Sequence, residues 1–459
     1  MPFSHHTESQ HERTREAGPA LSRDTISRVT KRTKRFLSNL LVPLRVRDFR
    51  LLFGGQLISN IGDMFYTVAM PWFILSSGGG AQSLSVVLVA YGLPRAASPL
   101  LGGMLSDRLR PRRVMLLADS LRALLVGALA WLAFVGHPSL WLLCLIMALL
   151  GTCAGLFLPA SFSMMPDILP EADLPAGNSL GGTSTQLAIL VGPALAGLIV
   201  SHFQPAVGLV LDAFSFVISA ITLLLIHSSR TPGRLQRIPP GEHGERFANL
   251  TQEDSPLDES PPALTFWQLL RTSRFLRLLL VILVLSNFFG GAVSGVALPA
   301  FAHDRLKAGA SGYSLIIAAF GIGALIGGVG ASGLGRLSRR GMVVLLIWLL
   351  QSIAITLIPF AGIAFGVGGS ALVSGVEGLT NSLGNITFRT IVQQHFPRNL
   401  LGRINGAFFF CEFSLYPLSV ALAGVMVLHR GPLSVFLVNG ALGLLCMIYS
   451  ISQRELREM

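Results

Sequence analysis

Four ionisable residues lie deep within long apolar stretches of this sequence, where a charged side chain is costly to keep. They are Asp63, Arg95, Glu377 and Glu412. A charge in the hydrocarbon core of a membrane costs several kcal/mol, and it persists where it is paired or faces a water-filled cavity. Such a residue can take up and release a proton or contact a substrate. We therefore identify these four as candidates for proton coupling or substrate binding, with a structural ion pair as the alternative.

Two further sites carry charge in apolar surroundings. Arg122 follows Asp119 by three residues, which places both on one face of a helix and allows them to pair. We expect a structural pair near the cytoplasmic end of its helix, with a role in transport as the alternative, so Arg122 joins the candidates. Asp212 is expected to satisfy a helix end or an interhelical hydrogen bond.

The elements that position these residues are long apolar runs. The chain has 459 residues, of which 51% are hydrophobic and only 13% charged, and its mean hydropathy is +0.63. A run of about 20 apolar residues can span a bilayer as a helix. Twelve such runs are expected, near residues 50–75, 83–105, 113–135, 139–165, 178–201, 207–227, 275–301, 311–334, 341–361, 364–391, 402–428 and 432–451.

A hidden duplication divides these runs into two sets of six. Arg50, Ser59 and Asn60 recur 227 positions later as Arg277, Ser286 and Asn287. Pro170, Leu174, Asn178, Gly197 and Asp212 have counterparts at the same offset in Pro397, Leu401, Asn405, Gly424 and Asn439. One offset across most of a chain predicts two copies of one unit, as in many secondary transporters. The expected organisation is a tail (1–47), a six-helix bundle (48–227), a linker (228–273), a second six-helix bundle (274–452) and a C-terminus (453–459).

Basic residues indicate how the chain crosses the membrane. The tail holds ten Lys or Arg against four Asp or Glu and runs directly into the first apolar stretch, without interleaved aromatic residues. This pattern favours contact with anionic lipids over nucleic acid, and we expect the start of the tail to be disordered. Further arginines cluster after the second and eighth runs, so both termini and the linker are expected on the cytoplasmic side of the cell membrane.

The sharpest motif joins the second and third runs. Gly103, Leu105, Asp107, Arg108, Arg112 and Arg113 form G-x-L-x-D-R-x-x-x-R-R, which resembles the signature loop of the major facilitator superfamily. A weaker copy follows the eighth run, where Gly335 stands in the place of Asp107. The resemblance covers about residues 45–455 and implies an all-α membrane protein of twelve transmembrane helices in two pseudo-symmetric bundles. It also implies that the first, fourth, seventh and tenth spans line a cavity, which favours Asp63 and Glu377 among the candidates.

A second motif bears on the direction of transport. Gly192, Pro193 and Gly197 in the fifth run resemble the glycine- and proline-rich motif of antiporter branches of that superfamily. The opening of the first run, with Gly55, Gln56 and Asp63, resembles macrolide-efflux and siderophore-export members. The resemblance implies a proton-coupled exporter, and a helix-packing kink is the alternative reading of the glycines. An uptake symporter on the same fold is the second candidate function.

Other function classes find little support in the sequence. The four cysteines lie in apolar runs without ligand spacing, so we expect neither a metal site nor a disulfide framework. No phosphate-binding loop of an ATP-driven pump occurs, and no nucleophile–base pair suggests a membrane-embedded enzyme. We expect a monomer without a cofactor, whose partners are a small amphipathic substrate, protons and the bilayer. Drugs, macrolides and siderophores fit that description of the substrate.

Overall fold

The computed structural model describes residues 41–136, 138–227, 270–271, 273–334, 340–395, 404, 408 and 414–453. The first half of the described chain opens with a short 3-10 helix, η1 (Val42–Arg45). Its long helices are α2 (Arg47–Ser76), α3 (Gly80–Arg108), α4 (Pro111–Val135), α5 (Leu140–Ile168), α6 (Leu174–His202) and α7 (Pro205–Leu225). The turn η2 (Glu171–Asp173) precedes α6. Each helix lies within a few residues of its expected apolar run.

The helices of the second half differ more from the expected apolar runs than those of the first half. The seventh run forms α10 (Arg274–Ala292), the π-helical segment η3 (Val293–Ala297), α11 (Leu298–Ala300) and a second π-helical segment, η4 (Phe301–Arg305). The remaining helices are α12 (Gly309–Leu334), α13 (Arg340–His395), α15 (Tyr416–Arg430) and α16 (Leu433–Ser452). Single-turn π segments inside helices are uncommon and often lie at functional positions.

The helix α13 contains two of the expected apolar runs. Gly366 has φ 65° and ψ −156°, which is outside the helical region and strongly favours glycine. The Ser370 hydroxyl donates to the Ile358 carbonyl oxygen at 3.0 Å, and Gly384 packs on Trp348, so the two arms run antiparallel. The ninth and tenth expected runs are therefore the arms of one hairpin.

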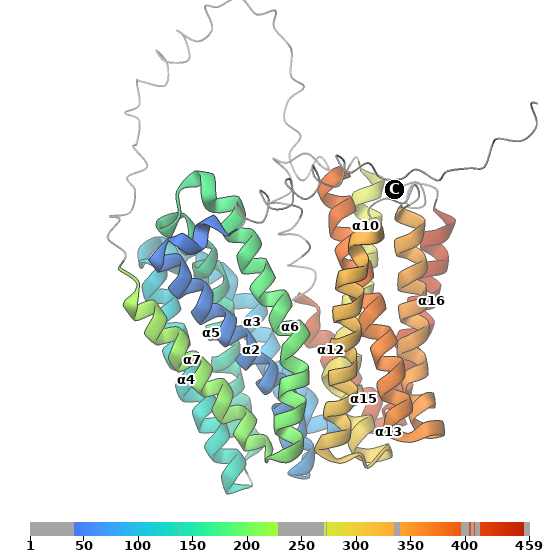
Figure 1. Cartoon of the computed structure of the whole chain (residues 1–459). Coiled ribbons are helices and arrows are strands. Elements are labelled where there is room, and N and C mark those ends of the chain that lie inside the picture. Colours follow the sequence, from blue (N-terminus) through green and yellow to red (C-terminus); the bar gives the residue numbers. More distant parts are fainter. Residues whose placement is uncertain are drawn as a thin grey trace, which may run out of the picture.

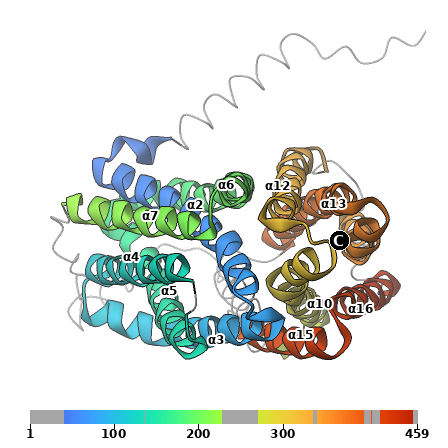
Figure 2. The same cartoon turned by 90° about the horizontal axis from the view of Figure 1, so that it is seen from below.

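The helices form two bundles side by side. Figure 1 shows the blue-to-green helices of the first half beside the yellow-to-red helices of the second half. Viewed from below, α6 lies next to α12 and α3 lies next to α15, and these are the long helices through which the halves meet (Figure 2). No strand occurs in the described residues. The all-α architecture of two six-helix bundles is confirmed.

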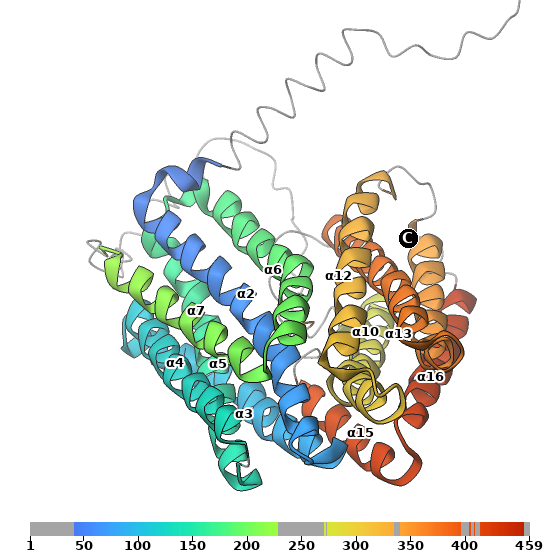
Figure 3. The same ribbon diagram turned by 60° about the horizontal axis from the view of Figure 1, so that its bottom comes forward.

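The hydrophobic core is asymmetric along the helix axes. Near the C-terminal end of α2 and the N-terminal end of α12, one buried cluster joins both halves. Near the opposite ends of the helices, where α2 begins and α16 ends, each buried cluster belongs to one half alone. Among the described residues, the two bundles are thus held together by apolar packing at one end only. Figure 3 shows this end brought forward.

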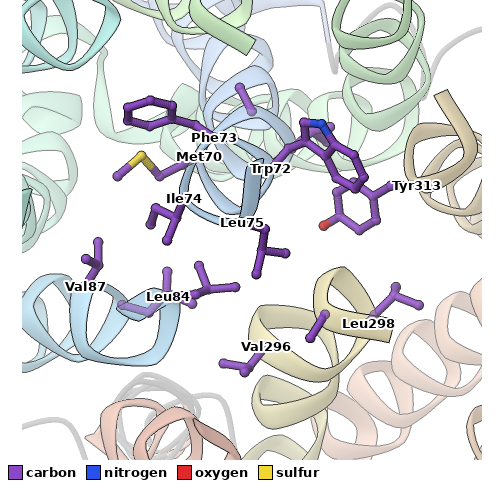
Figure 4. Packing of buried hydrophobic residues seen from close by; sticks show 14 of the residues in the cluster. Met70, Trp72, Phe73, Ile74, Leu75, Leu84, Val87, Val296, Leu298 and Tyr313 are labelled. Carbon is purple, nitrogen blue, oxygen red and sulfur yellow. The ribbon is translucent and has the colours of Figure 1, made fainter. Parts of the chain in front are cut away.

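The shared packing has an aromatic centre. The ring of Trp72 on α2 stacks on that of Tyr313 on α12, with 5.9 Å between centroids, and lies 5.5 Å from the His303 ring. Around them, Leu75 and Leu84 of the first half face the helix that carries Val296 and Leu298 (Figure 4). We name this set the plug, defined by Trp72, Leu75, Leu84, Val296, Leu298 and Tyr313.

Candidate functional site

A buried ion pair forms the base of a polar cluster within the first bundle. Arg122 and Asp119 lie one helical turn apart on α4, with Nη1 of Arg122 at 3.5 Å from Oδ1 of Asp119. The Ser219 hydroxyl on α7 donates to Oδ2 of Asp119 at 2.6 Å. The pair expected from the sequence is present. It lies near the middle of α4, however, and not at the cytoplasmic end of the helix.

Aromatic rings enclose the Arg122 guanidinium. Its Cζ lies 4.7 Å from the centre of the Phe157 ring on α5 and 5.3 Å from that of Phe216 on α7. Arginine stacks well on aromatic faces, and a desolvated cation gains from their negative faces. Arg122 is only 7% exposed, so it acts as a fixed positive charge inside the bundle.

Asp63 lies within electrostatic range of this fixed charge. It is half-buried near the middle of α2, and its carboxylate interacts electrostatically with the guanidiniums of Arg122 and Arg95. Arg95 of α3 is half-buried too, with its Cζ 5.5 Å from the centre of the Tyr91 ring. The structure therefore brings Asp63, Arg95 and Arg122, three of the sequence candidates, into one cluster.

A polar stripe on α2 leads to Asp63. Gln56, Asn60 and Asp63 are half-buried and Thr67 is exposed, at spacings of four, three and four residues that place them on one face of the helix. Asn60 donates to the Ser184 hydroxyl of α6 at 3.1 Å. Such a face belongs against water or protein and not against lipid.

Glu377 lies on a similar stripe in the second bundle. Glu377, Asn381, Asn385 and Arg389 follow at intervals of four on α13, and their exposure rises toward His395. Asn385 donates to the Asn381 side chain at 3.1 Å, whereas no cation faces Glu377 among the described residues. Glu377 therefore does not join the cluster around Arg122. Glu412, the fourth deeply placed candidate, lies outside the described residues.

The signature loop ends α3 and begins α4. Gly103, Asp107 and Arg108 form the last turns of α3, while Arg113 is exposed in the first turn of α4. Arg112 donates from Nε to the Leu223 carbonyl oxygen at 2.8 Å and from Nη2 to that of Leu224 at 2.7 Å. It thereby satisfies carbonyl groups at the C-terminal end of α7, where a cation is favoured. The second copy of the loop, residues 335–339, lies outside the described residues.

The glycine motif of α6 provides two close contacts. A Cβ added to Gly192 would overlap the side chain of Met64, the residue after Asp63. A Cβ added to Gly197 would lie 2.9 Å from the backbone oxygen of Ser314 on α12. Gly192 therefore seats α6 against the Asp63 region, and Gly197 brings α6 against the second bundle. Pro193 lies between them, inside the helix.

Most of the sequence matches a known family. The sequence model of the Major Facilitator Superfamily covers residues 52–420. This chain belongs to the major facilitator superfamily. The resemblance seen in the Asp107 loop is thus confirmed, and the protein is a multi-pass membrane transporter and not an enzyme.

Its curated relatives include efflux proteins at low identity. The chain is 27% identical to the multidrug efflux pump Tap of Mycolicibacterium fortuitum over 425 residues, which cover 89% of this chain and 96% of the relative. It is 22% identical to macrolide efflux protein A of Streptococcus pyogenes, over 90% of this chain and 97% of the relative. The similarity to macrolide-efflux members is therefore confirmed.

Solved structures share the fold. The chain superimposes on a D-xylose-proton symporter with a TM-score of 0.63 and 15% identity, covering 89% of this chain and 96% of that one. A bacterial homologue of the iron transporter ferroportin, in an inward-facing state, gives a TM-score of 0.60 at 17% identity, covering 89% and 99%. At these identities the likeness shows the fold alone.

Sequence reasoning missed some members of the cluster. Asp212 was expected to satisfy a helix end or an interhelical hydrogen bond; it is 1% exposed and lies beside Gly62, the residue before Asp63. Tyr66 and Tyr91, whose ring centroids are 6.2 Å apart, also lie next to the charged groups. The signal for Asp212 was its position in an apolar run, which is the same signal that identified Asp63.

Proposed function

We propose that this transporter is a proton-coupled exporter of amphipathic small molecules that works by alternating access. The observation that carries the proposal is the charged cluster of Asp63, Arg95 and Arg122 in the middle of the first bundle. Residues 48–227 and 274–452 are the two moving units, and residues 228–273 connect them.

The cluster has the properties that proton coupling needs. Asp63 lies on a polar stripe, so water can reach it, and it interacts electrostatically with the fixed positive charge of Arg122. A carboxylate between an apolar environment and a cation can change its protonation when the conformation alters either influence. Asp63 is the proposed proton carrier, and Glu377, which no cation faces among the described residues, is the proposed contact for substrate.

The core asymmetry supports alternating access. The plug joins the bundles at one end, while the clusters at the other end are separate. With the termini in the cytoplasm, as the arginine distribution indicates, this arrangement is an inward-facing state. The Asp107 loop at the cytoplasmic side then stabilises the opposite, outward-facing state by contacts between the halves. The similarity to efflux proteins favours export over uptake.

The deciding experiment is a transport panel in inverted membrane vesicles with an imposed proton gradient. Lipophilic drugs, macrolides and siderophores are compared as substrates, with vesicles lacking the protein as the blank. We expect gradient-dependent accumulation of at least one amphipathic compound inside the vesicles. Gradient-driven movement in the opposite direction would show an uptake symporter and refute the proposal.

The role of Asp63 is tested by Asp63→Asn. The amide keeps the shape of the side chain and removes its titration, so gradient-driven export should be lost while protein yield and substrate binding are retained. Asp304→Asn is the matched control, since Asp304 is an exposed carboxylate near the end of η4 whose ion-pair partner among the described residues is its neighbour His303. Unchanged export by Asp63→Asn would exclude an obligatory proton-carrying role at this position.

A further inference from the structure

A second carboxyl group in the first bundle lies beside Asp63 and forms no ion pair with any described residue. Asp212 is 1% exposed in α7, and a Cβ built on Gly62 would lie 2.8 Å from its Oδ1. Its carboxyl group therefore rests on the backbone of α2, one residue before Asp63. The two carboxyl groups also interact electrostatically.

The direct partners of Asp212 are weak. The Ser215 hydroxyl donates to the Asp212 backbone oxygen at 2.7 Å and lies 3.5 Å from Oδ1, so its single proton serves mainly the backbone. The Arg122 guanidinium is held by Asp119 and by two aromatic rings. A carboxylate buried in an apolar medium without a paired charge is strongly unfavourable.

The charges around Asp212 do not balance. The helices packed on α7 are α2, α4 and α6. They contribute Asp63 and Tyr66 from α2 and the Asp119–Arg122 pair from α4. The Tyr66 hydroxyl donates to Sδ of Met147 at 2.9 Å, and on α6 the ionisable residue is His202, in the last turn. With Arg95 included, three carboxyl groups face two guanidiniums.

We propose that Asp212 and Asp63 share one exchangeable proton, and that Asp212 holds it while Asp63 exchanges it with water. The proposal deepens the proton-coupled export proposed above and rests on it. Loading adds a proton from water to the carboxylate pair, and release returns that proton to water on the other side, with no other bond made or broken. The proton removes the one negative charge that the two guanidiniums leave uncompensated.

The second bundle supplies a natural comparison. At the offset of 227 residues, Gly290 stands in the place of Asp63 and Asn439 in the place of Asp212. Asn439 is 7% exposed and its Nδ2 has no hydrogen-bond partner among the described residues. An amide is therefore compatible with this position of the fold, and Asp212→Asn should assemble normally.

The proposal is tested by infrared difference spectroscopy of the purified protein, which detects the carbonyl stretch of protonated carboxyl groups. Glu377→Gln is the background for every variant, because Glu377 is half-buried with no cation facing it among the described residues and would add a band of its own. At neutral pH this background should show one such band that shifts in heavy water. Asp212→Asn should lose it, because Asp63 interacts electrostatically with both Arg122 and Arg95 and then has no carboxyl group of α7 beside it. Asp63→Asn should keep the band, because Asp212 stays buried with only the Ser215 hydroxyl as its direct partner, and the band should exchange more slowly. Asp304→Asn is again the control. A band that persists in Asp212→Asn would overturn the proposal.

Transport provides the independent arm. For a compound that the wild type exports, the ratio of export with and without the proton gradient should fall to one in Asp212→Asn, while exchange of substrate without a gradient continues. Retained gradient dependence in this variant would refute the role of Asp212. If the infrared band were absent and export depended on sodium concentration instead, the carboxyl pair would be a sodium site, and the proposal would be refuted. Failure of the wild type to use a proton gradient would refute the proposed function, and the infrared result would still stand for the carboxyl pair.

Discussion

At the scale of single residues, one signature arginine has a role that geometry explains. The last carbonyl groups of a helix lack partners within the helix, and Arg112 donates to two of them at the end of α7. The arginine therefore ties the third helix of the first bundle to its sixth. This role is structural, and it is separate from the conformational role proposed for Asp107.

We expect Arg112→Gln to lower stability by about 1 to 2 kcal/mol, because two charge-assisted hydrogen bonds are lost at a partly solvated site. The measurement is the thermal unfolding midpoint of the purified protein in detergent. Arg113→Gln is the matched control, since Arg113 is the neighbouring exposed arginine of the same motif. Equal midpoints for the two variants would contradict the assigned contact.

At the scale of elements, the hairpin of α13 depends on one backbone conformation. Gly366 has a positive φ and nothing within 4 Å of its added Cβ, so the cost of a substitution there is conformational and not steric. Gly366→Ala should destabilise the hairpin by about 1 to 3 kcal/mol. Gly368→Ala, two residues on, with open space and no positive φ, should have little effect on the same unfolding measurement.

The contact of α6 with α12 gives a prediction about conformation. Gly197→Ala would place Cβ 2.9 Å from the Ser314 backbone oxygen, so the two helices must separate. The state with the closed plug is thereby weakened, and about 1.4 kcal/mol shifts the ratio of states tenfold. A cysteine at Ser85, which packs on Gly424 across the bundles, should then react faster with a thiol reagent. Gly182→Ala on the same helix, with nothing within 4 Å, should leave the rate unchanged.

The sequence predicts some parts of the fold and of the candidate site better than others. Apolar length located the helices, and the three-residue spacing of Asp119 and Arg122 predicted their pair. No polar loop surrounds the turn at Gly366, so composition could not show that the ninth and tenth runs form the two arms of one hairpin. The approach of Asp212 to Gly62 joins helices far apart in sequence, and neither periodicity nor spacing carries that information.

At the scale of the whole molecule, the orientation in the membrane can be measured directly. In a background without the four native cysteines, Ser76→Cys and Ser311→Cys lie at exposed positions near the plug end. An impermeant thiol reagent should label both from outside intact cells and should leave Ser255→Cys in the linker unlabelled until the cells are opened. Labelling of Ser255→Cys from outside would reverse the assignment of the two faces.

The charged groups are unevenly shared between the two copies. The positions of Asp63 and Asp212 are occupied in the second copy by Gly290 and Asn439, so the carboxyl pair occurs in one bundle only. The second bundle instead carries Glu377 with no cation facing it among the described residues. This distribution agrees with the proposed roles of the bundles, proton exchange in the first and substrate contact in the second.

The one-ended packing of the bundles also bears on how the protein unfolds. Each bundle has its own apolar cluster near the termini, and among the described residues the plug is the cluster that belongs to both. Cooperative unfolding of the two bundles as a single unit therefore depends on Trp72, Tyr313 and their neighbours. A chain in which this packing is weakened should melt in two steps, one for each bundle, because neither bundle needs the other to bury its remaining core. The contacts that join the bundles at one end thus also determine whether thermal unfolding occurs in one transition or in two.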